Sequence, residues 1–356
     1  MDTTEKLLKT LTEAHGVPGY ETPVRGIIRK YLEPLGDLSQ DKIGSIICEK
    51  KGKDNHPRIM LAGHMDEIGF MVKNISKDGF ISFIPLGGWF DQVLLSQRVI
   101  IKSSKKDIIG VIGAKPPHLL SEDERGKVIK KTEMYIDIGA TSKEDVENAG
   151  IRIGDPIIPR SDFLVLNNKK TYMSKAFDDR VGTALIISTL ERLKEQDHPN
   201  TIIGVATVQE EVGLRGATTS VYAVDPDVAI ILESDIAGDV PGIKEVDSSI
   251  KLGEGPTILL YDARMIPNLA LRDFVIDLAD RLEIPIQLST ITRGATDGGV
   301  IHLHKTGVPT IVIGVPARNI HSDSSIIHRD DFDRAVTLLT NLLSQLDADS
   351  VSKFTV

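Results

Sequence analysis

Hydrophobic residues recur at helical spacing in two stretches near the start of the chain, 7–11 and 24–32, and these stretches predict two amphipathic helices. Farther along, short apolar runs alternate with amphipathic stretches. Strands are expected at 59–62, 202–208, 228–232 and 310–313, and helices at 181–193, 269–282 and 332–346. Strands this apolar, separated by helices, favour an α/β fold in which helices sandwich a central mixed sheet.

The stretch from 70 to 162 has a different pattern. Its strand-like runs, at 80–84, 98–101, 108–112 and 134–138, are short and separated by charged or Gly/Pro turns. We interpret 70–162 as a β-rich domain inserted into a discontinuous α/β domain made of 1–69 and 163–356. Within it, Thr141 and Glu144 predict the capping box of one short helix.

Composition narrows the class of protein. The 356 residues include 42 Lys and Arg against 51 Asp and Glu, a net charge of −9, which argues against a broad surface for nucleic acid or an anionic membrane. Cys48 is the single cysteine, so an intrachain disulfide is excluded. No apolar run is long enough for a membrane span, and the first ten residues lack the apolar core of a secretory signal. We therefore expect a cytoplasmic protein.

Candidate chemistry begins where the first apolar strand ends. His64 and Asp66 follow that strand directly. A neutral imidazole is a good ligand for zinc or cobalt, and a nearby carboxylate can fix its tautomer. Such a pair also occurs in proteins as a satisfied polar contact without a metal.

Two acidic pairs follow, and each also has an ordinary structural explanation. Asp178 and Asp179 open a predicted helix, where a carboxylate can simply cap the helix. Glu210 and Glu211 follow an apolar strand and could form a surface turn. Neighbours on an ideal strand point to opposite faces, so both glutamates reach one site only if the backbone leaves strand geometry after Gln209.

The constellation as a whole favours a metal centre. Glu233 and His321 also lie beyond the ends of apolar strands, and such ends face the crevice where α/β proteins bind ligands. Two imidazoles and three carboxylates, one of them shared, would give each of two metal ions three protein ligands with open positions. Glu210 would then be the spare carboxylate, free to act as general base.

Four motifs carry a resemblance to a known family. They are 63–69 (GHMDEIG), 175–180 (KAFDDR), 208–217 (VQEEVGLRGA) and 318–322 (RNIHS). In this order they resemble the signatures of the tetrahedral, TET-type dinuclear metallo-aminopeptidases, which include glutamyl and deblocking aminopeptidases and are often labelled endoglucanases. The resemblance covers essentially the whole chain and implies the α/β fold of co-catalytic metallopeptidases.

The resemblance also implies roles for individual residues. One of two divalent ions, zinc or cobalt, would be held by His64, Asp178 and Glu233, and the other by Asp178, Glu211 and His321. Glu210 matches the catalytic base and Asp66 the residue that orients the first histidine. The family usually has Asp where this chain has Glu233; the register of the residues that follow favours Glu233 over Asp235. In the family the inserted domain mediates dimerisation, and six dimers form a dodecamer.

The expected function is therefore that of a metal-dependent aminopeptidase. It would remove N-terminal residues from short peptides through a metal-activated water with Glu210 as base. A related dinuclear amidohydrolase or carboxypeptidase is the alternative, and a glycosidase or a non-catalytic metal-binding assembly protein is a weaker one. Arg293 and Arg318 could favour an acidic first residue or pair with internal carboxylates. The run 86–90, which holds the single tryptophan, could anchor a homo-oligomer interface or lie in the core.

Overall fold

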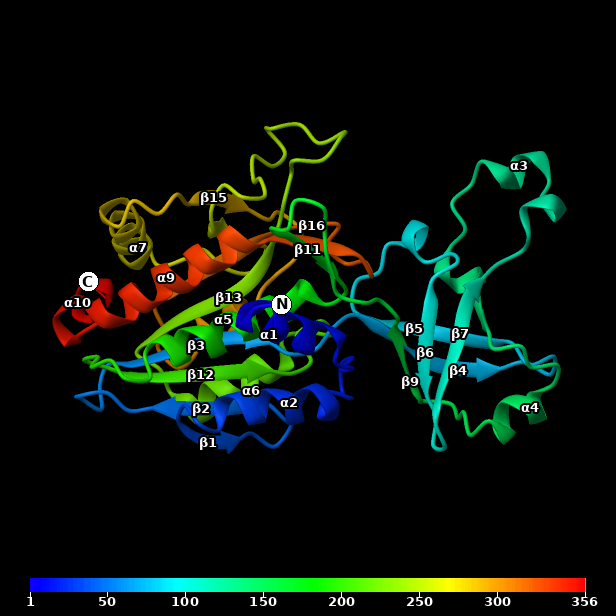
Figure 1. Cartoon of the computed structure of the whole chain (residues 1–356), viewed down its shortest axis with the longest axis horizontal. Coiled ribbons are helices and arrows are strands. Elements are labelled where there is room, and N and C mark those ends of the chain that lie inside the picture. Colours follow the sequence, from blue (N-terminus) through cyan, green and yellow to red (C-terminus); the bar gives the residue numbers. More distant parts are fainter. Residues whose placement is uncertain (356) are drawn as a thin grey trace.

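A large mixed sheet forms the body of the protein in a computed structural model, which describes residues 1–355 (Figure 1). Its strands are β1 (Asp37–Gln40), β2 (Ile46–Lys50), β3 (Arg58–His64), β10 (Leu164–Val165), β11 (Thr171–Ser174), β12 (Thr201–Thr207), β13 (Val228–Ile236), β14 (Thr257–Tyr261), β15 (Gln287–Thr290), β16 (Thr310–Arg318) and β17 (Ser325–His328). The order is β1-β2-β12-β3-β13-β16-β17-β11-β10, and β14 pairs with β16 and β15.

The centre of this sheet is parallel. β12, β3, β13 and β16 lie side by side in one direction, and Thr207 pairs with His64 while Glu233 pairs with Gly314. Because the carboxyl ends of these strands meet at one edge, the polar residues that follow them gather there. This register is what brings the predicted site residues together.

Helices cover both faces of the sheet, as predicted. They are α1 (Thr3–Glu13), α2 (Thr22–Leu32), α5 (Phe177–Arg192), α6 (Arg215–Val224), α7 (Leu269–Arg281), α8 (Gly298–Ile301), α9 (Arg329–Gln345) and α10 (Ala348–Ser352). Strand residues alternate between two apolar cores: Leu61 belongs to the core that α1, α2, α5, α7 and α9 cover, whereas Ala62 belongs to the core that α6 and α8 cover. The α/β prediction is thus confirmed, and Cys48 is buried. None of the described helices is both long and apolar enough to cross a membrane.

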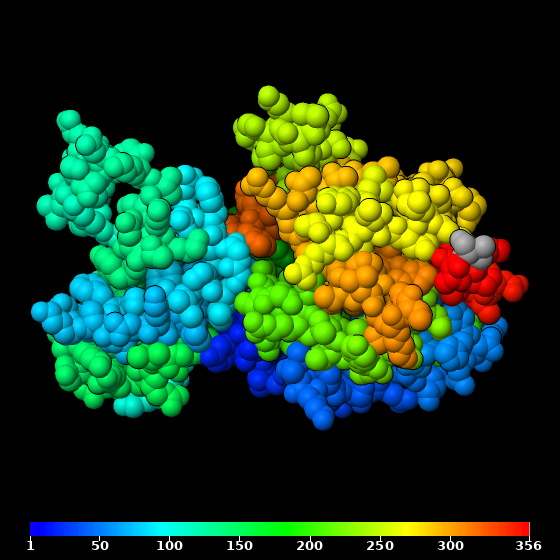
Figure 2. Space-filling view, turned by 180° about the vertical axis from the view of Figure 1, so that it is seen from behind, coloured from blue at the N-terminus to red at the C-terminus, as the bar shows by residue number. Residues whose placement is uncertain are grey.

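A closed β-barrel stands beside this body (Figures 1 and 2). Its strands are β4 (Gly69–Ile75), β5 (Ile81–Leu86), β6 (Arg98–Lys102), β7 (Asp107–Gly113), β8 (Tyr135–Asp137) and β9 (Pro156–Pro159), and α3 (Glu122–Arg125) and α4 (Lys143–Asn148) lie in its connections. The barrel has its own apolar core, in which Trp89 stacks on Phe70. The expected capping box is wrong by one residue: Ser142 caps α4 through the N–H of Asp145.

A buried ion triad ties the end of α1 to the edge of the sheet. Glu67 lies 2.6 Å from the Nζ of Lys175 and 3.4 Å from Nη2 of Arg180, and the side chains are at most 3% exposed. Burial lowers the pKa of Lys175 to about 8. The Arg180 guanidinium also donates to carbonyls within 11–16. The triad therefore fixes the turn after α1 against the loop that follows His64.

Removing Glu67 should destabilise the fold more than removing an exposed ionic partner. Glu67→Ala leaves two buried cations without their carboxylate, a change that typically costs about 3–5 kcal/mol. Urea unfolding would measure the loss in the free energy of unfolding. The control is Glu147→Ala, which breaks an exposed pair 3.5 Å from Lys143 and should cost less than about 1 kcal/mol. Equal losses in the two variants would contradict a structural role for the triad.

Candidate metal centre

A cavity of about 760 Å³ opens at the carboxyl edge of the parallel strands, where the barrel meets the sheet. One wall comes from the sheet and α5, and another from the barrel loop that includes Gly88 and Phe90. The cavity is lined by six of the seven predicted site residues: His64, Asp178, Glu210, Glu211, Glu233 and His321. The seventh, Asp66, lies fully buried behind them.

The Asp178 carboxylate bridges the two histidines. Its Oδ1 lies 3.1 Å from Nε2 of His64, and its Oδ2 lies 3.1 Å from Nε2 of His321. Both Asp178 and Asp179 have non-helical backbone angles, so the regular turns of α5 begin after them. Asp179 instead accepts the backbone N–H of Gly182 and of His64. One aspartate thus serves the helix start, and the other faces the imidazoles.

The backbone turns sharply between β12 and the paired glutamates. Gln209 has a φ of +56°, so the chain leaves strand geometry at the predicted position. The Asp66 carboxylate accepts the backbone N–H of Glu210 at 3.0 Å and that of Glu211 at 3.1 Å. Asp66 therefore holds the turn that brings both glutamate side chains to one cavity. The sequence predicts a contact of this carboxylate with His64 but not its contacts with the backbone of the two glutamates.

The histidines are oriented by backbone carbonyls. His64 Nδ1 lies 3.1 Å from the Asp66 carbonyl, closer than the 3.5 Å to the Asp66 carboxylate. His321 Nδ1 lies 2.6 Å from the carbonyl of Gly88 in the barrel. Donation from Nδ1 to a carbonyl leaves each Nε2 free to accept or to bind a metal. The sequence does not predict Gly88 as a site residue. The one local feature that could have indicated it is the Gly87-Gly88 pair, because consecutive glycines allow a close approach of the backbone.

The remaining carboxylates take different positions. Oε2 of Glu210 lies 3.8 Å from His64 Nε2, and Oε1 of Glu211 lies 3.8 Å from His321 Nε2. Oε2 of Glu233 lies 3.9 Å from His64 Nε2. Asp235 is turned away and accepts a hydrogen bond from Ser289. Of the two acidic residues in this stretch, the structure therefore brings Glu233 to the cluster.

Two groups of residues have ligand atoms close enough to share one ion. One group is His64, Asp178 and Glu211, and the other is His64, Asp179 and Glu233; within each, the ligand atoms lie within 4.8 Å of one another. His321 stands outside both groups, although it faces Asp178. In the second group, both oxygens of Asp179 already accept backbone N–H groups, which leaves Asp178 the freer carboxylate beside His64.

Four buried carboxyl groups and two histidines crowd together in this cluster, and their pKa values shift as a result. Burial and nearby carboxylates raise the pKa of Glu210 and Glu233, and burial together with Asp178 raises that of Glu211 to about 8. Burial opposes the charge of His321, yet its contacts with Asp178 and Glu211 raise its pKa to about 10. Within residues 1–355, the ion pairs of the four cavity carboxylates are made with the two histidines, and no lysine or arginine pairs with them.

These observations fit a divalent cation. Oε1 of Glu211 is buried and lacks a hydrogen-bond partner within residues 1–355. Buried carboxylates are normally paired or bind a metal, and no lysine or arginine of the described chain performs that task here. Imidazole and carboxylate donors together suit zinc, cobalt or manganese. The donor set, the bridging Asp178 and the orphaned Glu211 oxygen therefore all match a metal centre.

Other polar residues complete the surroundings of the site. Arg318 donates hydrogen bonds to both carboxylate oxygens of Asp239. Of the two roles expected for Arg318, the structure therefore shows pairing with an internal carboxylate. Arg293 lines the cavity, and its side chain has no hydrogen bond or ion pair within residues 1–355. Asp297 is buried beside the cluster and accepts the hydroxyl of Thr207. Burial raises the pKa of Asp297 to about 6.

Comparison with known proteins connects this geometry to one family. The family model described as M42 glutamyl aminopeptidase matches residues 44–338, and a second one, described as AMPT, matches residues 2–27. The glutamyl aminopeptidase of Lactococcus lactis is 37% identical over 350 residues, which are 97% of this chain and 97% of that protein.

Solved structures give the same result. The TET aminopeptidase of a marine sediment archaeon, Thaumarchaeota archaeon SCGC AB-539-E09, is 48% identical with a TM-score of 0.97 and covers 99% of each chain. The TET1 peptidase of Pyrococcus horikoshii is 31% identical with a TM-score of 0.87, over 97% of this chain and 100% of that one. That peptidase can assemble into a tetrahedron or a large octahedral shell.

Zinc binding should strengthen as pH rises and should release protons. In the metal-free protein the raised pKa values of Glu211 and His321 mean that both hold a proton at neutral pH. A metal needs the carboxylate and the neutral imidazole, so protons compete with it at low pH. Calorimetric titration of the chelated protein with zinc, in two buffers that differ in ionisation enthalpy, would count the protons released. An affinity that stays flat between about pH 6 and pH 9, with no protons released, would contradict this prediction.

Proposed function

The chain belongs to the M42 glutamyl aminopeptidase family and is a peptide hydrolase, and we propose that it removes single N-terminal residues from short peptides at a dinuclear metal centre. The observation that carries this proposal is the bridging carboxylate. Asp178 presents one oxygen to each of two imidazoles, 3.1 Å away in both cases. A carboxylate placed in this way can be shared between two metal ions.

The proposed ligand sets follow from this bridge. His64, Asp178 and Glu233 would hold one ion, and Asp178, Glu211 and His321 the other. When bound, such ions, zinc or cobalt, polarise the scissile carbonyl and lower the pKa of a water molecule. The carbonyls of Asp66 and Gly88 would keep the two imidazoles in the tautomer that binds through Nε2.

Glu210 is the proposed general base. Its carboxylate lines the cavity beside His64, and its backbone N–H is held by Asp66. In the proposed reaction, Glu210 takes a proton from the attacking water as the new C–O bond forms. It then delivers this proton to the nitrogen of the leaving amine, and the peptide C–N bond breaks. Asp66 acts on this step as a positioning residue, because it touches the backbone of Glu210 rather than the substrate.

A carboxypeptidase or another dinuclear amidohydrolase could use a similar set of ligands. Family membership favours an aminopeptidase over both. A glycosidase would leave His64 and His321 without a chemical role.

We further propose that the inserted domain, residues 70–162, mediates dimerisation and that six dimers form a dodecamer. Ile109 and Val111 are exposed side by side on one face of β7, and Phe90 is exposed at the barrel loop. Exposed apolar side chains on a barrel with its own packed core suit a contact with a second copy. Trp89 takes no part in such a contact, since it is buried. The tetrahedral assembly of the Pyrococcus horikoshii TET1 peptidase supports the proposal.

The requirement for a free amino group tests the proposed activity. One short peptide is supplied free and N-acetylated, and mass spectrometry follows both over time. Acetylation removes the charge of the amine, so kcat/KM should fall about 100-fold or more while the free peptide loses single N-terminal residues. Cleavage from the C-terminus, or equal cleavage of both peptides, would instead indicate a carboxypeptidase or an amidohydrolase.

Substitutions of the two adjacent glutamates should have different effects on kcat and on metal content. Glu210→Gln removes the proposed base, so kcat should fall about 10²- to 10⁴-fold while the metal content stays the same. Glu211→Gln removes a proposed ligand and should lower the metal content of the purified protein. Elemental analysis and steady-state kinetics on both variants make each the control of the other. Loss of metal in Glu210→Gln alone would reverse the two assignments.

A further inference from the structure

A second cavity, of about 340 Å³, adjoins the catalytic one. It lies between β15, the end of β13 and the segment 245–250, which belongs to the connection that projects from the α/β body (Figures 1 and 2). The two cavities share Ile236, Ile291 and Arg293. We propose that this second cavity binds the main chain of an extended peptide substrate beyond its second residue, through hydrogen bonds to the free edge of β15. The inference rests on the proposed aminopeptidase activity.

One edge of β15 is free to pair with an extended chain. Within residues 1–355, β15 pairs with β14 alone. The backbone N–H groups of Gln287 and Ile291 donate to carbonyls on the β14 side. Because backbone groups of a strand alternate in direction, those of Leu288 and Thr290 point away from β14. Both residues are exposed and line the second cavity, so they offer the donors and acceptors that an added strand would use.

The spacing along β13 matches a substrate longer than a dipeptide. Glu233 faces the catalytic cavity, and Asp235, two residues farther along the strand, lines the second one. Two residues of a strand span about 7 Å. An extended peptide advances by a similar distance over two residues, so a chain whose first residue lies at the metal centre would reach the second cavity with its third.

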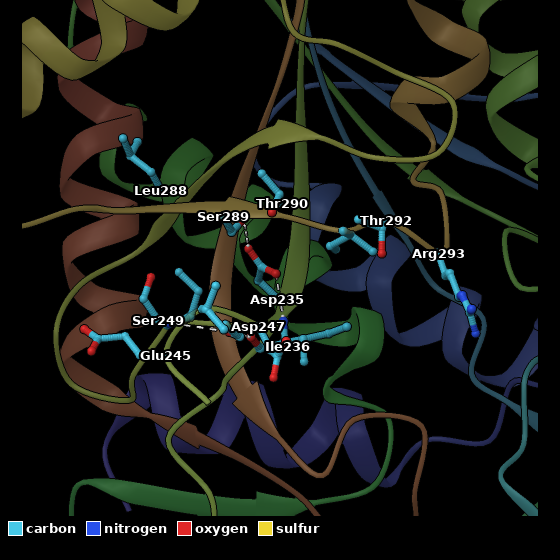
Figure 3. Close-up of a pocket in the computed structure, with 14 residues that line it drawn as sticks. Asp235, Ile236, Glu245, Asp247, Ser249, Leu288, Ser289, Thr290, Thr292 and Arg293 are labelled. Atoms are coloured by element: carbon cyan, nitrogen blue, oxygen red, sulfur yellow. Dashed lines mark hydrogen bonds between the residues drawn. The ribbon is translucent and has the colours of Figure 1, made fainter. Parts of the chain in front are cut away.

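The lining of the second cavity includes groups that suit a peptide main chain. Beside the acidic Glu245 and Asp247, it holds hydroxyl groups, which both donate and accept hydrogen bonds, from Ser248, Ser249, Ser289, Thr290 and Thr292. Figure 3 shows Asp235 bound to Ser289, with Arg293 at the far end of the cavity. Since Asp235 also accepts the backbone N–H of Ile236, its carboxylate is already satisfied. A peptide needs such neutral, two-way hydrogen bonding at every residue.

The test compares a dipeptide with a tetrapeptide that shares its first two residues. In Thr290→Trp, a bulky side chain blocks the edge of β15, and the ratio of kcat/KM for the tetrapeptide to that for the dipeptide should fall about tenfold, mainly through KM. The control is Ser39→Trp, because Ser39 is also exposed on an edge strand, β1, at the opposite side of the sheet. That variant should keep the ratio of the wild-type protein.

A modified substrate makes the test independent of any variant. A tetrapeptide N-methylated at its third residue cannot donate that hydrogen bond, and on the wild-type protein its kcat/KM should fall toward that of the dipeptide. An unchanged ratio in folded Thr290→Trp, or full activity on the methylated peptide, would overturn the inference. A wild-type protein that does not cleave the dipeptide from its N-terminus would instead overturn the proposed function.

Discussion

Concentrated negative charge at one edge of the sheet is the constraint on which the rest of the site depends. Glu210, Glu211 and Glu233 converge on one cavity because parallel strands end together there, and the start of α5 brings Asp178 to the same cavity. The two available imidazoles offset only part of this charge. Protons neutralise the rest in the metal-free protein, as the raised pKa values of Glu210, Glu211 and Glu233 indicate, and a divalent cation that displaces them would let these carboxylates ionise together.

The basic residues nearest the site in the sequence form ion pairs away from the cavity. Lys175 lies three positions before Asp178, and Arg180 two positions after it, yet both pair with Glu67 one layer deeper. Glu67 in turn directly follows Asp66, the residue that holds the glutamate turn. The internal cations thus stiffen the loops that carry the site, while the carboxylates facing the cavity remain free for ions. The charged groups that stabilise the fold therefore lie one layer of side chains below the carboxylates that face the cavity.

Much of this arrangement could be predicted from the sequence. The ends of the apolar strands locate His64, Glu233 and His321. Adjacent residues of a strand point to opposite faces, so the sequence also predicts that the backbone leaves strand geometry near Gln209, as the structure shows. Two features were inaccessible because they depend on contacts between distant segments. The carboxylate of Asp66 reaches across to the turn after β12, 144 positions along the chain, and the carbonyl of Gly88 reaches His321 over 233 positions. No local pattern encodes either contact.

The contact between Gly88 and His321 makes the inserted barrel part of the candidate site. Gly87 has a φ of +92°, and a Cβ there would lie 2.9 Å from Oε2 of Glu211; at Gly88 a Cβ would lie 3.1 Å from Nδ1 of His321. Two glycines therefore let the barrel loop press directly against both residues proposed to hold the second ion. A larger residue at either position would push on the site itself. The barrel loop is thus a wall of the candidate metal centre, although the barrel has an apolar core of its own.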